Sequence, residues 1–268
     1  SNAMLDNRPI GVFDSGIGGL TIVKNLMSIL PNEDIIYFGD IARIPYGTKS
    51  RATIQKFAAQ TAKFLIDQEV KAIIIACNTI SAIAKDIVQE IAKAIPVIDV
   101  ITAGVSLVDN LNTVGVIATP ATINSNAYAL QIHKKNPNIE VYSNPCGLFV
   151  SMIEEGFVSG HIVELVAKEY LSYFHDKNIQ ALILGCTHYP IIKESIAKIL
   201  DVKLIDPSLQ ASKMLYSLLF ENKLLNTTKS NPEYRFYVTD IPLKFRSVGE
   251  MFLQTEMQHL EIVSLDSY

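Results

Sequence analysis

The sequence is poor in cysteine, and its few cysteines form neither a disulfide pattern nor a metal-binding pattern. The 268 residues include only Cys77, Cys146 and Cys186. Three thiols are too few, and too odd in number, for a disulfide framework in a chain of this size. None lies in a CxxC or CxxH pattern, so a zinc site would need ligands from distant segments. We therefore expect reduced thiols and no metal.

The sequence also lacks a basic field and any long apolar run. Lys and Arg number 23 against 27 Asp and Glu, which gives a net charge of −4, and the basic residues are scattered. This distribution argues against nucleic acid as a partner. No apolar run approaches the roughly 18 residues of a membrane-spanning helix, and no charged-then-apolar signal opens the chain. We expect a cytoplasmic protein with no membrane partner.

Low-complexity tracts are absent too, and 49% of the residues are hydrophobic, so the chain can bury a large core. Ser1, Asn2 and Ala3 ahead of Met4 are interpreted as a remnant of tag removal. About 265 residues then suit one large or two medium domains.

Short β-branched runs alternate with segments of helical periodicity. The expected strands are residues 10–13, 34–39, 71–77, 97–100, 113–119, 139–143, 180–186, 202–206 and 234–239. The expected helices include residues 50–69, 79–94, 159–176 and 190–200. Several of the strands are continuously apolar, as strands buried on both faces should be. The alternation predicts an α/β protein with mainly parallel sheets flanked by helices.

An internal repeat divides the chain into two similar halves. IGVFDS at 10–15 resembles VGVIAT at 114–119, and IACNT at 75–79 resembles LGCTHYP at 184–190, with similar offsets. Two pseudosymmetric domains are predicted: 4–97 plus 208–268, carrying Cys77, and 98–207, carrying Cys186. Ligands of parallel α/β sheets bind beyond the carboxyl ends of strands. Both cysteines should therefore line one interdomain cleft.

Cys77 and Cys186 each end an apolar strand where a helix is expected to begin. A cysteine there is commonly a small buried hydrophobe, which is our interpretation of Cys146. For the matched pair, the positive end of a helix would favour thiolate. A thiolate is a base and a thiol is an acid, so the pair suits proton transfer.

Polar residues follow both cysteines. Asn78 and Thr79 follow Cys77, and Thr187 and His188 follow Cys186. Asn and Thr are ordinary helix caps, and the same amides and hydroxyls at a helix start can also bind a carboxylate. His188 is placed to tune the thiol two residues away.

Two further loops follow predicted strands. FDSGIGGLT has an incomplete GxGxxG pattern and no P-loop lysine, so it is a weak nucleotide-binding signal. We expect its glycines to let the backbone approach a small ligand and Asp14 to supply a charge. GDIARIPYG packs Asp40, Arg43, Tyr46 and Gly47 into one short loop.

Five strings in this order, FDSGIGGLT, GDIARIPYG, ACNT, VGVIATPAT and LGCTHYP, closely resemble bacterial glutamate racemases of the aspartate/glutamate racemase superfamily. The resemblance covers residues 8 to 207. It implies a cofactor-independent isomerase that interconverts L- and D-glutamate, supplies D-glutamate for peptidoglycan and cell shape, and forms a homodimer. It also implies two pseudosymmetric α/β domains with glutamate between them.

The matching motifs imply functional roles for individual residues of this chain. The implied catalytic residues are Cys77, Cys186, Asp14, His188 and Glu154. The implied substrate-binding residues are Asp14, Ser15, Tyr46, Gly47, Asn78, Thr79, Thr119, Thr187 and His188. Glu155 adjoins Glu154, and the sequence does not separate the two.

The chain departs from the family pattern at Ile41, where a small polar residue is usual, and at Ser151, where proline is usual. Three alternatives remain open from the sequence. The first is an aspartate racemase of the same fold. The second is a thiol hydrolase that uses Cys186 with His188, and the third is a two-lobed binding module without catalysis.

Overall fold

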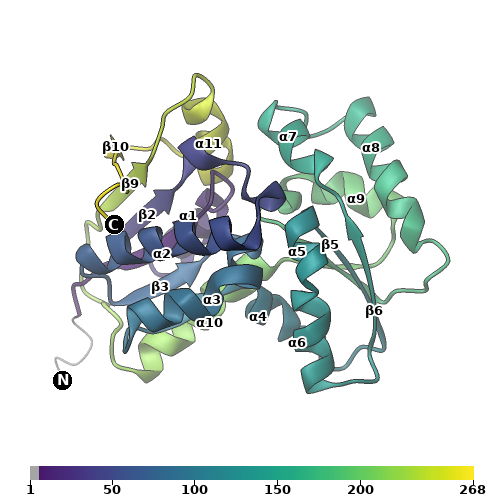
Figure 1. Cartoon of the computed structure of the whole chain (residues 1–268), viewed down its shortest axis with the longest axis horizontal. Helices are drawn as coiled ribbons and strands as arrows, with labels where there is room; N and C mark the ends of the chain where they lie inside the picture. The colour runs from purple at the N-terminus through teal and green to yellow at the C-terminus, as the bar shows by residue number, and fades with distance from the viewer. Residues whose placement is uncertain (1–5) are drawn as a thin grey trace.

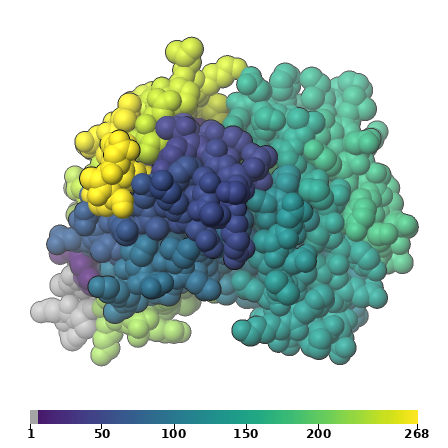
Figure 2. Space-filling view, in the orientation of Figure 1, coloured from purple at the N-terminus to yellow at the C-terminus, as the bar shows by residue number. Residues whose placement is uncertain are grey.

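The computed structural model describes residues 6–268, so the leading Ser-Asn-Ala lies outside the described residues. Figure 1 shows two α/β bodies side by side, each built on one parallel sheet. In the space-filling view the purple-to-blue surface of the first body meets the teal surface of the second along a continuous boundary (Figure 2). The predicted α/β class with two mainly parallel sheets flanked by helices is confirmed.

The first sheet has the order β10-β9-β2-β1-β3-β4. Its strands are β1 (Ile10–Asp14), β2 (Ile35–Gly39), β3 (Ala72–Ile75), β4 (Val97–Asp99), β9 (Tyr234–Val238) and β10 (Leu260–Ile262). The second sheet has the order β6-β5-β7-β8. Its strands are β5 (Thr113–Ala118), β6 (Glu140–Pro145), β7 (Ala181–Gly185) and β8 (Lys203–Ile205). The order β2-β1-β3-β4 thus matches β6-β5-β7-β8, which is the structural form of the repeat.

Helices cover both faces of both sheets. Those of the first body are α1 (Leu20–Ile29), α2 (Arg51–Asp67), α3 (Asn78–Ala92), α10 (Pro207–Glu221) and α11 (Phe245–Leu253). Those from α4 to α9 are α4 (Val100–Val105), α5 (Pro120–Ser125), α6 (Ala127–Lys135), α7 (Leu148–Glu154), α8 (His161–Leu171) and α9 (Lys193–Ile199). The 3-10 turns are η2 (Ile41–Arg43), η3 (Tyr46–Thr48), η4 (Ser172–Phe174) and η5 (Tyr189–Ile192).

Strand alternation decides which helix meets which face of a sheet. In β1, Phe13 packs in the cluster that contains α2 and α3, whereas Val12 packs in the cluster that contains α1 and α10. Successive side chains of a strand point to opposite faces, so a strand that is apolar throughout needs cover on both. All five residues of β1 are buried. The strand ends are thereby fixed in a rigid frame, and the loops after them carry the polar residues.

The chain crosses between the bodies near β4 and again near β8. The predicted boundary between 97 and 98 falls inside β4, whose residues pair with β3 in the first sheet. β8 pairs with β7 in the second sheet, and β9 then pairs with β2 in the first. The exact limits of the two domains stay a prediction.

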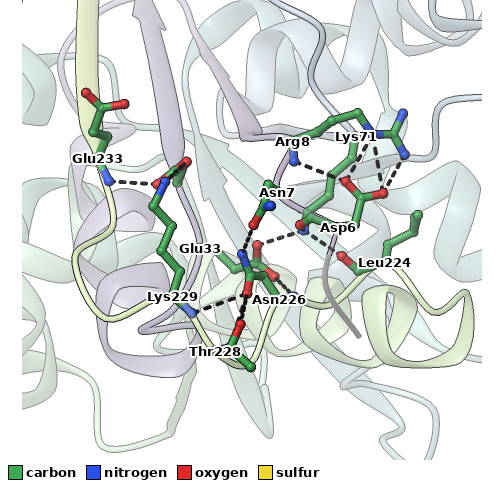
Figure 3. Close-up of polar contacts among 11 residues, drawn as sticks. Asp6, Asn7, Arg8, Glu33, Lys71, Leu224, Asn226, Thr228, Lys229 and Glu233 are labelled. Atoms are coloured by element: carbon green, nitrogen blue, oxygen red, sulfur yellow. Dashed lines mark hydrogen bonds and ion pairs between the residues drawn. The ribbon is translucent and has the colours of Figure 1, made fainter. Parts of the chain in front are cut away.

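A buried ion pair anchors the returning chain to the first body. The ammonium group of Lys71 donates to Glu33 Oε1 at 2.7 Å and to the carbonyl oxygens of Asp6 and Leu224 at 2.7 and 2.5 Å (Figure 3). Glu33 Oε2 accepts from the backbone N–H of Asn226 at 2.8 Å. Lys71 precedes β3, so this cluster lies at the opposite end of the sheet from the loops that follow β1 and β3.

Among residues 6–268, no helix is both long and apolar enough to cross a bilayer.

Candidate active site

A cavity of about 420 Å³ lies where loops from both sheets converge. Every predicted site residue lines it: Asp14, Ser15, Tyr46, Gly47, Cys77, Asn78, Thr79, Thr119, Glu154, Cys186, Thr187 and His188. Ile17, Ile44, Val150 and Ser151 add apolar or small surface. The two cysteines therefore face one shared space, from loops at equivalent positions in the two sheets.

Cys77 lies at the start of α3 and is almost fully buried. Its sulfur accepts from the Ser15 hydroxyl at 3.2 Å and from the backbone N–H of Ile80 at 3.5 Å. Burial raises the pKa of this thiol to about 12, and the charge of Asp14 acts in the same direction. The expectation that the helix start favours thiolate is therefore wrong for Cys77, because desolvation outweighs both hydrogen bonds. In this arrangement Cys77 holds its proton.

Cys186 has different surroundings. The helix predicted over 190–200 is divided into η5 and the seven-residue α9, so no α-helix begins at Cys186. Instead, Cys186 Sγ lies 3.7 Å from His188 Nδ1, and His188 Nε2 lies 2.8 Å from Glu154 Oε1. Imidazole, rather than a helix dipole, is the partner of this sulfur.

The His188 imidazole is buried between two acidic groups. Burial alone lowers its pKa, but the hydrogen bond and charge of Cys186, followed by those of Glu154, raise the pKa to about 10. His188 is thus a cation at neutral pH when Cys186 is thiolate. The adjacent Glu155 points away from the cavity to pair with Lys244 at 2.9 Å. The structure places Glu154, and not Glu155, against His188.

Asp14 is held by the glycine-rich turn that follows it. Its carboxylate accepts from the backbone N–H groups of Ser15 at 2.9 Å and Gly19 at 2.6 Å, and from the Tyr37 hydroxyl at 3.1 Å. Burial raises the pKa of this carboxyl despite those bonds. A Cβ at Gly19 would lie 2.7 Å from Asp14 Oδ2, so only glycine lets the turn wrap the carboxylate so closely.

Gly18 of the same turn meets the second body. A Cβ there would lie 2.1 Å from Thr187 Oγ1 and 2.7 Å from His188 Nδ1. The sequence predicts that the glycines let the backbone approach a ligand. Gly16 and Gly18 line the cavity, so that expectation stays a prediction, and Gly18 also lets the first body approach the loop that carries Cys186.

Hydroxyl groups line the junction between the bodies. Thr79 Oγ1 lies 3.0 Å from Thr119 Oγ1 and 3.3 Å from Thr122 Oγ1. The Tyr46 hydroxyl is turned away from this group and donates to Asp40, and a Cβ at Gly47 would lie 3.0 Å from Thr119 Cβ. Tyr46 thus offers the cavity its ring rather than a free hydroxyl.

Cys146 is separate from this site. It is completely buried, does not line the cavity, and its thiol is directed to the carbonyl oxygen of Asn144 at 3.5 Å. This geometry fits its interpretation as a small buried hydrophobe.

Four residues that do not line the cavity contact residues that do, and the sequence did not predict them. Tyr37 donates to Asp14, Thr122 joins the hydroxyl cluster, Tyr128 donates to Asn78, and the Phe252 ring packs edge-on against His188 with centroids 5.1 Å apart. Thr122 lies in the VGVIATPAT string and could have been singled out. The other three are aromatic residues of buried segments, where a tyrosine or phenylalanine reads as core.

A sequence model of the Asp/Glu/Hydantoin racemase family matches residues 11–215. A glutamate racemase of Neisseria meningitidis is 48% identical over 262 residues, which cover 96% of this chain and 97% of that protein. The chain belongs to this family, among its glutamate racemases.

Solved structures agree with this family assignment. The crystal structure of glutamate racemase from Francisella tularensis in complex with D-glutamate is 99% identical, with a TM-score of 0.97 over 98% of this chain and all of that one. The glutamate racemase structure from Thermus thermophilus in complex with β-chloro-D-alanine is 37% identical, with a TM-score of 0.89 over 98% of this chain and all of that one. The chain is therefore an isomerase of the amino-acid racemase type.

Proposed function

We propose that this enzyme interconverts L- and D-glutamate without a cofactor, by proton transfer at Cα between Cys77 and Cys186. The observation that carries the proposal is that both thiols line one cavity, from loops at equivalent positions in two pseudosymmetric sheets. Inversion of a stereocentre needs a base on one face of the carbon and an acid on the other. Two opposed thiols meet that need, whereas one does not.

The proton balance is symmetrical. The thiolate of one cysteine takes the Cα proton, which breaks the C–H bond and leaves the electron pair on the carbon. The thiol of the other cysteine gives its proton to the opposite face and becomes thiolate. Burial holds the thiol proton on Cys77, and the imidazole of His188 lies beside Cys186, so we assign proton abstraction in one direction to Cys186 acting as thiolate. The reverse reaction exchanges the two roles.

The cavity offers donors for an anionic substrate. Asn78, Thr79, Thr119 and Thr187 bring an amide and hydroxyls to its wall, and we assign them, with Ser15, Tyr46 and Gly47, to substrate binding. Asp14 and Glu154 are the acidic groups near the two cysteines. A carbanion-like transition state without a cofactor must be stabilised by such preorganised groups in a dry pocket.

We also propose a location and a cellular role for the enzyme. The chemistry requires free thiols, all three cysteines of the chain are free, and the cytosol keeps thiols reduced. We therefore place the enzyme in the cytoplasm as a source of D-glutamate for peptidoglycan, and so for cell-wall biogenesis and cell shape, and we propose a homodimer.

The deciding experiment follows the optical rotation of L-glutamate, with no pyridoxal phosphate or metal added. We expect it to decay to zero, and Cys77→Ala and Cys186→Ala each to slow it by about 10²- to 10⁴-fold, the usual loss of an acid–base group. Cys146→Ala is the matched control and should keep full activity. Turnover of L-aspartate in preference to L-glutamate would reject the substrate.

Cys186, His188 and Glu154 are also arranged as a nucleophile, a base and an orienting carboxylate, as in a thiol hydrolase, but the family assignment favours racemisation. That chemistry has no use for Cys77. An active Cys77→Ser variant that accumulates an acyl-enzyme would favour hydrolysis over racemisation.

A further inference from the structure

Tyr128 is a buried tyrosine at the junction of the two bodies. It lies in α6, which contacts α3 and α4 between the two sheets (Figure 1). Its ring fits between two glycines: a Cβ at Gly104 would lie 3.3 Å from the ring, and a Cβ at Gly185 would lie 3.2 Å from it. Gly185 directly precedes Cys186. The ring is therefore fixed against the strand end that carries one of the two thiols.

The hydroxyl of Tyr128 reaches the other thiol's segment. It donates to Asn78 Oδ1, and Asn78 directly follows Cys77 at the start of α3. Asn78 and Tyr128 are both almost completely buried. One side chain thus contacts the residue before Cys186 and the residue after Cys77.

This hydrogen bond decides which way the Asn78 amide faces. An asparagine side chain has one oxygen acceptor and one NH2 group with two donors. With the oxygen committed to Tyr128, the NH2 group is turned away from Tyr128, and Asn78 lines the cavity. Burial, followed by the negative charges of Asp99 and Cys186, raises the pKa of Tyr128 well above its usual range, so the phenol stays a donor.

We propose that Tyr128 is a positioning residue that holds the Asn78 NH2 group toward the cavity, where it donates to a carboxylate of the substrate. This inference rests on the proposed function, because it assumes a carboxylate ligand in this cavity. Without the phenol, the amide is free to rotate by half a turn and present its oxygen. An oxygen facing the cavity would repel the carboxylate instead of binding it.

The test is Tyr128→Phe, which removes the hydroxyl and keeps the ring. We expect KM for both glutamate enantiomers, and Kd for D-glutamate by calorimetry, to rise about tenfold, the usual loss of one hydrogen bond to a charged group. The turnover number should stay within about twofold, because the contact acts on bound substrate and transition state alike. Asn78→Ala should give a similar rise, and the double variant no further one.

Tyr189→Phe is the matched control. Its phenol is also buried and donates to the carbonyl oxygen of Cys146 at 2.9 Å, but Cys146, unlike Asn78, does not line the cavity. The control should lose thermal stability to a similar degree with KM unchanged. A Tyr128→Phe variant with wild-type KM, or one whose effect adds fully to that of Asn78→Ala, would overturn the positioning role.

A second variant serves if Tyr128→Phe does not fold. Asn78→Asp keeps an oxygen for Tyr128 and replaces the NH2 group by a second oxygen, so D-glutamate binding should weaken more than tenfold. Unchanged binding by folded Asn78→Asp would contradict the inference. A wild-type enzyme that does not racemise glutamate would contradict the proposed function instead, whereas normal racemisation by both wild type and Tyr128→Phe would contradict only the role of Tyr128.

Discussion

Gly18→Ala should separate the two halves of the site with little change elsewhere. An added Cβ would lie 2.1 Å from Thr187 Oγ1, and ordinary contact begins at 3.4 Å, so the two loops must move apart by about 1.3 Å (3.4 − 2.1). The near atoms belong to the side chains of Thr187 and His188, which are buried and have little room to move. The shift therefore falls on the spacing between Asp14 and the Cys186 loop.

A misplacement of about 1 Å in an active site can cost about 10²-fold in rate, which is about 2.7 kcal/mol of transition-state stabilisation. We therefore expect kcat/KM for glutamate racemisation to fall about a hundredfold in Gly18→Ala, measured in both directions by circular dichroism. The far-ultraviolet spectrum should be unchanged.

Gly11→Ala is the control for the added methyl group. Its Cβ would lie 3.1 Å from Val70 Cγ1 inside the first body, away from the cavity. Overpacking there should cost about 1–3 kcal/mol of stability and leave the kinetics unchanged. If Gly18→Ala keeps wild-type kcat/KM, or if both variants lose activity in proportion to stability, the close approach of the two loops has no catalytic role.

Three further predictions concern charge. The His188 pKa is raised from its ordinary 6.5 to about 10. Its contribution to the free energy of unfolding is therefore complete below pH 6.5 and is lost as the pH rises through about 10. Chemical denaturation of His188→Gln should show a smaller loss of unfolding free energy at alkaline pH than wild type. Glu154→Gln removes the charge 2.8 Å from that imidazole and should lower kcat/KM about 10- to 100-fold, while an unchanged rate would exclude Glu154 from the site. Lys71→Met leaves Glu33 buried without its partner and should reduce the free energy of unfolding by about 3–5 kcal/mol, with KM unchanged in the folded enzyme.

The strand pattern and the repeat could be predicted from the sequence because buried parallel strands are apolar along their whole length. All nine expected strands have counterparts in the structure. The three-residue β10 (Leu260–Ile262) was missed because it lies at the edge of the sheet and is largely exposed, so it lacks an apolar run. The helix predicted over 190–200 was wrong in its first turn, since periodicity alone does not distinguish a 3-10 turn from an α-helix.

The site could be predicted as a set of residues but not as a set of protonation states. Motif order placed the predicted residues around one cavity. The pKa of Cys77 depends on how deeply α3 and the Ser15 turn bury its sulfur, and that depth follows from packing between elements far apart in the sequence. The roles of Tyr37 and Tyr128 could not be predicted for the same reason. The sequence around a tyrosine in an apolar segment does not indicate which polar atom its hydroxyl will contact.

The backbone repeat is symmetrical but the surroundings of its two thiols are not, and racemisation limits what that asymmetry can do. Mirror-image amino acids have equal free energy in water, so no arrangement of groups can favour one of them at equilibrium. A hydroxyl and a helix start lie at Cys77, against an imidazole and a carboxylate at Cys186. This difference can change the populations of the protonation forms of the free enzyme, but it cannot change the equilibrium ratio of the two enantiomers. Under the proposed two-cysteine mechanism, the form with its proton on Cys77 would accept one enantiomer directly. The other enantiomer would require the opposite protonation form, so the asymmetry would affect how fast the two forms exchange and leave the direction of the reaction unchanged.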